Sequence, residues 1–170
     1  MSERLDPASL LRLLREAGVD YIVIGGLAVI AHGVQRFTKD VDVCPSPERA
    51  SLERLASTLT EIDASQLGLG DLTQDEFPFD PRNPDELAEG GNFRLDTRLG
   101  ILDLMQWIPG IEADHAYPVL AAEATSVDVF GAEIRICSLA HLRAMKRAAD
   151  RPQDRLDLEQ LAIARGEEPD

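Results

Sequence analysis

Apolar positions recur at helical spacing in some stretches of the chain and as short continuous runs in others, so both helices and strands are predicted. A first helix is expected from Pro7, with Asp6 as its N-cap, to a stop at Gly18. The run Tyr21–Ile24 is rich in β-branched residues and ends at Gly25, which predicts a buried strand. The two kinds of element therefore follow each other from the start of the chain.

The rest of the chain continues this pattern. The expected strands cover residues 37–43, 93–97 and 101–107, together with the two arms of a hairpin over 125–137. The expected helices cover residues 27–31, a segment that begins at Ser46-Pro47 and buries Leu52, Leu55, Ala56 and Leu59, and residues 118–124, 138–147 and 154–164. Residues 63–92 lack apolar periodicity and are rich in Gly, Pro and acids, so they are interpreted as a long loop or lid with one short strand.

Strands mixed with helices define an α/β (or α+β) domain. The length of 170 residues suits a single domain that is large enough to bury a core. Within it, we expect residues 1–137 to form the core and residues 138–170 to form C-terminal helices packed on that core.

Composition and charge exclude several classes of protein. The formal net charge is −14, which argues against a broad binder of duplex DNA, whose affinity comes largely from Lys and Arg on phosphates. No apolar run is long enough to span a membrane, and the first six residues contain no apolar signal-peptide core. Two cysteines, Cys44 and Cys137, do not make a disulfide framework, so a cytoplasmic location is expected.

The charge is spread unevenly along the chain. Residues 61–90 contain nine acids and one base, whereas residues 135–155 contain six bases and two acids. The basic stretch has two interpretations, a solvated helix face or a contact with a polyanion inside a small site.

The most informative stretch is Gly25 to Asp42. A predicted strand delivers Gly25 and Gly26 to the start of a helix, where glycine lets the backbone approach a ligand closely. Asp40 and Asp42 follow at positions i and i+2 of a strand, so their side chains lie on the same face. Two carboxylates held together favour a cation between them, and Mg²⁺ prefers such oxygen ligands. Solvated carboxylates and tight glycine packing are the simpler alternatives.

A third acid strengthens the metal hypothesis. Asp103 stands in the otherwise apolar run Ile101–Met105, and an acid inside a core strand is costly unless it is paired or coordinated. Three carboxylates would complete a site for two divalent ions that hold the attacking and leaving oxygens of a phosphoryl displacement.

At these positions the sequence resembles a known group of enzymes. Gly25-Gly26, the stretch Arg36–Asp42 and Asp103 resemble the three signature elements of the polymerase-beta-like nucleotidyltransferase superfamily.

Residues 138–147, with Arg151, Asp154 and Asp157, resemble the C-terminal element of one branch of that superfamily. The branch contains small nucleotidyltransferases related to abortive-infection and type IV toxin–antitoxin proteins. The resemblance covers roughly residues 8–165.

The resemblance implies a nucleotidyltransferase fold, with a mixed β-sheet flanked by helices and a short C-terminal helical element. It also implies Mg²⁺-dependent transfer of a nucleoside monophosphate from an NTP to a hydroxyl group, with two ions in the active complex and Mn²⁺ as an alternative. Asp40 and Asp42 would ligate both metal positions, and Asp103 would ligate the catalytic metal and help deprotonate the acceptor.

The nucleotide-binding residues implied by the resemblance come from the glycine turn, the segment before the two aspartates and the C-terminal helices. They are Gly25, Gly26, Arg36, Thr38, Lys39, Lys146 and Arg151. Two features depart from the pattern, because many members have Gly-Ser where this chain has Gly25-Gly26, and the chain lacks the large acceptor-binding domain of bigger relatives.

Two hypotheses therefore stay open. The first is an active nucleotidyltransferase whose acceptor is an RNA end, a protein or a small molecule. The second is a non-catalytic module that binds a nucleotide or a cognate toxin or antitoxin protein. In either case we expect the three acids to be nearly buried and unpaired when no metal is bound.

Overall fold

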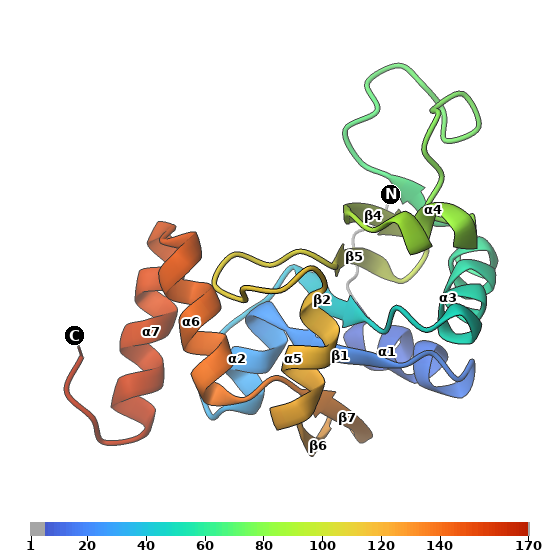
Figure 1. Cartoon of the computed structure of the whole chain (residues 1–170). Helices are drawn as coiled ribbons and strands as arrows, with labels where there is room; N and C mark the ends of the chain where they lie inside the picture. Colours follow the sequence, from blue (N-terminus) through green and yellow to red (C-terminus); the bar gives the residue numbers. More distant parts are fainter. Residues whose placement is uncertain (1–5, 170) are drawn as a thin grey trace.

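A computed structural model describes residues 6–169 of the chain. Residues 1–5, which carry most of the segment examined for a signal-peptide core, and residue 170 lie outside the described residues. The described part forms a seven-stranded mixed sheet with helices packed on both faces, in the strand order β3-β4-β5-β2-β1-β7-β6 (Figure 1). This confirms the predicted α/β (α+β) class. In the described residues, no helix is long and apolar enough to cross a membrane.

The strands pair in both directions. β1 is antiparallel to β2 and parallel to β7, β2 is parallel to β5, and the pairs β3–β4, β4–β5 and β6–β7 are antiparallel. Their bounds are β1 Tyr21–Ile24, β2 Asp40–Pro45, β3 Ser65–Gln66, β4 Asn92–Thr97, β5 Gly100–Met105, β6 Thr125–Val129 and β7 Ala132–Ile136.

Most helices lie where the sequence predicts them. Their bounds are α1 Pro7–Glu16, α2 Gly25–Ala31, α3 Arg49–Glu61, α4 Pro84–Glu89, α5 Ala116–Glu123, α6 Leu139–Ala149 and α7 Pro152–Ala164. Asp6 caps α1 and Ser138 caps α6, each by accepting a hydrogen bond from a first-turn amide. α2 begins at Gly25 rather than at residue 27, and α3 begins three residues after Ser46.

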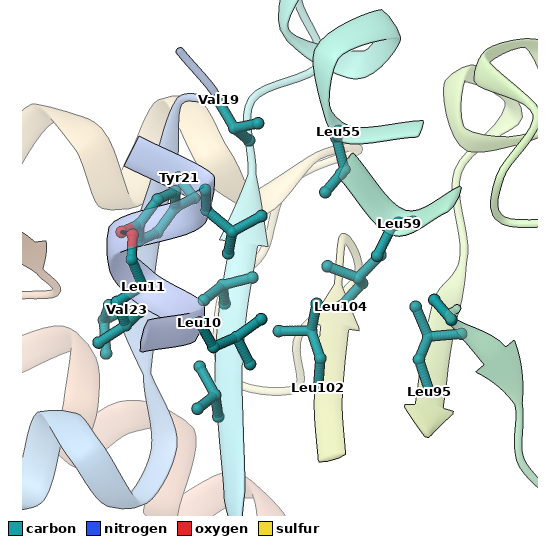
Figure 2. Close-up of a cluster of buried hydrophobic side chains, with 14 of the residues drawn as sticks. Leu10, Leu11, Val19, Tyr21, Val23, Leu55, Leu59, Leu95, Leu102 and Leu104 are labelled. Carbon is teal, nitrogen blue, oxygen red and sulfur yellow. Dashed lines mark hydrogen bonds between the residues drawn. The ribbon is translucent and has the colours of Figure 1, made fainter. Parts of the chain in front are cut away.

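One face of the sheet is covered by α1 and α3. Leu10 and Leu11 from α1 and Leu55 and Leu59 from α3 are fully or almost fully buried against the sheet. Figure 2 shows these side chains on the same side of the sheet as the labelled residues of β1, β5 and β4, with β2 lying between β1 and β5. The sheet residues of this cluster alternate with residues of the other face, as the period of a strand requires. They include Tyr21, Val23, Val41, Val43, Phe93, Leu95, Leu102 and Leu104.

The other face is covered only in part. Ile22 and Ile24 of β1 and Cys44 of β2 pack there against α2, α5 and the C-terminal helices. Leu142 of α6 and Leu161 of α7 belong to the same buried cluster, so the C-terminal helices share the core of the preceding chain. In the described residues this cluster takes no side chain from β3 or β4. On this face β4 carries the polar residues Asn92, Arg94 and Asp96, beside the acids of β2 and β5.

The segment 63–92 holds more structure than the sequence indicates. It contains β3 and a loop that projects from the sheet (Figure 1). It also contains α4, so the interpretation of residues 63–92 as a loop with one short strand missed a helix. Asn83 caps α4 and Pro84 opens it, a start signal that the sequence carried. Leu87 is fully buried, and its carbonyl accepts a hydrogen bond from the side chain of Gln106.

We expect Leu87→Ala to lower the free energy of unfolding by about 2–4 kcal/mol, because the truncation leaves a cavity where α4 is anchored. Leu72→Ala is the matched control, since Leu72 lies in the same segment with 49% of its surface exposed. Urea denaturation of both variants checks this. Equal losses would mean that α4 is not held by this side chain.

Candidate active site

A row of four residues crosses four neighbouring strands. Ile24 of β1 is the register partner of Asp42 on β2, Asp42 is the partner of Asp103 on β5, and Asp103 is the partner of Arg94 on β4. Directly paired residues have Cβ atoms about 5 Å apart, so these four side chains form one row on the same face of the sheet, with Ile24 buried under the helices and Arg94 half-exposed at the other end. Asp40 lies two residues before Asp42 and shares its face. The structure thus brings the three predicted acids together.

Arg94 neutralises two of these acids. Its Nη1 donates to Oδ2 of Asp103 at 2.8 Å and to Oδ2 of Asp40 at 3.1 Å, while its Nη2 donates to Oδ1 of Asp40 at 3.2 Å. The expectation that all three acids are unpaired was therefore wrong for Asp40 and Asp103. The physical reason is the hairpin register, which places a cation directly opposite Asp103.

Asp42 has a different environment. Burial raises the pKa of this carboxyl to about 7, and the charge of Asp103, a hydrogen bond with Asp103 and the charge of Asp40 act in the same direction. The charge of Lys146 opposes them. Burial also raises the pKa of Asp103, although Arg94 counteracts this. Ionisation of Asp42 is therefore opposed both by its burial and by the acids beside it.

Gly25 and Gly26 are required by the side chains that pack on them. Gly25 has φ +65°, and a Cβ there would lie 2.1 Å from Oδ2 of Asp42. A Cβ on Gly26 would lie 2.7 Å from Oγ1 of Thr38. Tight packing was the simpler alternative to ligand binding for Gly25 and Gly26, and the structure shows that both glycines are tightly packed. The same contacts hold the turn directly beside the acids.

A second group of charges joins the C-terminal helices to the loop before β2. Asp154 and Asp157 of α7 are each only 1% exposed. Nζ of Lys146 lies 3.0 Å from Asp154 and 2.9 Å from Asp157, and Nη1 of Arg36 donates to both oxygens of Asp157 at 2.7 and 2.6 Å. Arg151 also donates to Asp154. The structure thus ties three of the predicted phosphate-binding cations to acids of α7.

These ion pairs are electrostatically balanced. Burial alone would raise the pKa of Asp154, but hydrogen bonds from Arg151 and Lys146 hold it below its ordinary value. The charges of Lys146 and Arg151 also reach the acid group, because Lys146 acts on Asp42 and Arg151 acts on Asp103. The cations of this network therefore lie next to the row of acids.

The remaining predicted residues divide in two. The hydroxyl of Thr38 donates to the carbonyl oxygen of Asp40, which fixes the backbone at the start of β2. Lys39 is exposed. In the basic stretch 135–155, Arg143 pairs with Glu167 and Arg155 with Asp150. Internal ion pairing was not one of the two interpretations given for that stretch.

The donor set fits Mg²⁺ in chemistry and in backbone position, since three carboxylates from adjacent strands share one face. As the side chains stand, however, no group of three or more His, Cys, Asp or Glu in residues 6–169 is arranged to hold a metal ion. Asp40 and Asp103 are turned toward Arg94 instead. A metal ion held by the three acids would have to replace the guanidinium.

Arg94 is the residue that sequence reasoning missed. Its position follows from the hairpin, in which Thr97 pairs with Gly100 across the two-residue turn Arg98-Leu99. Counting back from that turn places Arg94 opposite Asp103.

Comparison with known families and with curated proteins gave no match to this chain. The site is therefore interpreted from its own geometry.

We expect Gly25→Ala to lower the free energy of unfolding more than Gly33→Ala, by about 1–3 kcal/mol, because only the first adds a clash with Asp42. Gly33 is the matched control, since it also has a positive φ, +101°, but a Cβ there would meet nothing within 4 Å. Urea denaturation of the two variants gives the difference. Equal losses would show that backbone strain alone accounts for both.

We expect Asp42→Asn to stabilise the metal-free protein at high pH. Because the folded pKa of Asp42 exceeds its unfolded value, the wild-type protein loses stability as the pH rises from about 4 to about 7. An asparagine does not ionise, so the free energy of unfolding of the variant should exceed that of the wild type by about 1–2 kcal/mol near pH 8 and by less near pH 5. Urea denaturation in EDTA measures this, with the exposed Asp71→Asn as control. A destabilised variant near pH 8 would contradict the assignment.

Proposed function

We propose that the protein is a Mg²⁺-dependent nucleotidyltransferase of the polymerase-beta-like superfamily, which moves a nucleoside monophosphate from an NTP to a hydroxyl acceptor. The observation that carries this proposal is the shared sheet row of Asp42 and Asp103, with Asp40 two residues away on the same face. Three carboxylates held this close repel one another, and Arg94 pairs with only two of them, so we attribute their convergence to a cation that they bind.

The residues of the site would divide the work as follows. Asp40, Asp42 and Asp103 would hold Mg²⁺, or Mn²⁺ in its place, which when bound neutralises the phosphates and activates the acceptor hydroxyl. Asp103 would also help deprotonate the acceptor hydroxyl, the role that the resemblance implies for it. Gly25 and Gly26 form the turn beside these acids.

Basic side chains of the C-terminal helices and of the segment before β2 would contact the triphosphate. Arg151 is mostly exposed and acts electrostatically on Asp42 and Asp103, so it is the best candidate of the C-terminal helices. Lys39 is exposed next to Asp40. Lys146 and Arg36, held by Asp157, would supply fixed positive charge behind them.

A second candidate function has an observation in its favour. Because Arg94 already pairs with Asp40 and Asp103, the acids are partly neutralised without a metal. This arrangement would suit a non-catalytic module that binds a nucleotide or a cognate toxin or antitoxin protein. If the protein is instead an active enzyme, its acceptor would be an RNA end, a protein or a small molecule. Both proposals include a cytoplasmic location.

The proposal predicts that an NTP with Mg²⁺ stabilises the protein by about 1–3 kcal/mol at saturation, through preferential binding to the folded state. Asp42→Asn should abolish this shift. Arg151→Ala should weaken it, and is preferred to a Lys146 variant because Lys146 is buried between two acids. Thermal unfolding with each NTP, with and without Mg²⁺, measures the effect.

Incubation with each labelled NTP, with and without RNA, then tests for transfer. Labelled product that disappears in Asp42→Asn supports the enzyme. A thermal shift without any labelled product supports the non-catalytic module, and the absence of both would contradict nucleotide binding altogether.

A further inference from the structure

Arg94 donates hydrogen bonds to carboxylates that would hold the proposed metal ion. Three of its hydrogen bonds go to Asp40 and Asp103, two of the three proposed ligands, and about half of its own surface is exposed. Its position follows from the β4–β5 hairpin, which fixes Arg94 opposite Asp103. A one-residue slip would turn this side chain to the other face, so the contact is a specified feature of the hairpin.

We propose that Arg94 is an internal counter-ion that competes with the divalent metal for Asp40 and Asp103, and thereby sets the metal affinity of the site. The inference rests on the proposed function, because it takes these carboxylates as metal ligands. It goes beyond that function by assigning to Arg94 a role that depends on its charge.

The competition follows from the geometry of the contacts. Asp40 uses both of its oxygens for the guanidinium, so neither is free to turn fully toward a metal. The guanidinium and a metal ion bound to the same carboxylates would also repel each other strongly in a partly buried site. Metal binding therefore requires the guanidinium to withdraw. The half-exposed side chain can do so into solvent without any change in the strand that carries it.

In the metal-free protein the same contact is favourable. Arg94 offsets the repulsion among three acids that lie on two adjacent strands. The residue thus stabilises the empty site and weakens the loaded one. A residue with a merely structural role would stabilise both states equally.

The test is the Mn²⁺ affinity of Arg94→Met, measured by electron paramagnetic resonance of the free ion. Methionine keeps much of the apolar stem and removes the charge. The variant should bind Mn²⁺ about tenfold more tightly than the wild type, because one neighbouring positive charge is lost. In EDTA its melting temperature should be lower, and saturating Mn²⁺ should remove most of that deficit.

Arg82→Met is the matched control. Arg82 also bridges two acids, Asp75 and Asp80, in the projecting segment before α4. Removing this charge should leave the Mn²⁺ affinity unchanged. Arg94→Lys should fall between the wild type and Arg94→Met, since lysine keeps the charge but not the forked contact.

The outcomes separate the two proposals. Equal Mn²⁺ affinity in wild type and Arg94→Met would overturn the role of Arg94 and leave the nucleotidyltransferase proposal standing. If neither protein binds Mn²⁺, both proposals fail.

A measurement on the wild-type protein covers the case in which Arg94→Met does not fold. The guanidinium NMR signals of Arg94 should shift when Mg²⁺ is added, whereas those of Arg82 should not. Metal binding without a shift at Arg94 would overturn the inference.

Discussion

Repulsion among three carboxylates is the constraint around which the site is built. Two unit charges 4 Å apart in a partly exposed protein environment interact with about 4 kcal/mol. That is a large part of the 5–15 kcal/mol by which a typical domain is stable. A sheet that places Asp42 beside Asp103 must therefore supply positive charge nearby or keep a carboxyl protonated. In the structure Arg94 pairs with two of the acids, and burial raises the pKa of the third, which favours its protonated form.

This constraint also explains why the C-terminal helices belong to the site. α7 contributes two fully buried acids, and α6 and the loop before β2 contribute the cations that pair with them. Breaking such a buried pair by removing one partner costs about 3–5 kcal/mol. The network therefore fixes α7 against both α6 and the loop that leads into Asp40. Its buried ion pairs with α7 thereby hold the positive charge of Lys146 close to Asp42.

The sequence predicted the elements that apolar patterning controls. It located β1, α1, α6, α7 and the three acids, because strand alternation and capping residues are local signals. It missed α4 and placed the start of α2 two residues late, since six- and seven-residue helices contain too few turns to show a period. It did not predict that Lys146 and Arg36 pair with Asp157, because that contact depends on how α7 packs on a loop far away in the sequence. Arg94 was missed because its position opposite Asp103 depends on the register of a hairpin whose turn, Arg98-Leu99, contains none of the usual turn dipeptides.

The two sets of cations around the acids differ in their access to solvent. Lys146 and its partners on α7 are almost fully buried, so exchanging them for a ligand would leave an uncompensated charge inside the protein. Arg94 is half-exposed at the open end of the row, where water can solvate a displaced guanidinium. Of the two sets of cations, Arg94 is therefore the one whose contacts with carboxylates can be replaced at lower cost. The buried network fixes the position of the acids, and the exposed contacts of Arg94 are the part of the row that the proposed metal ion would have to displace.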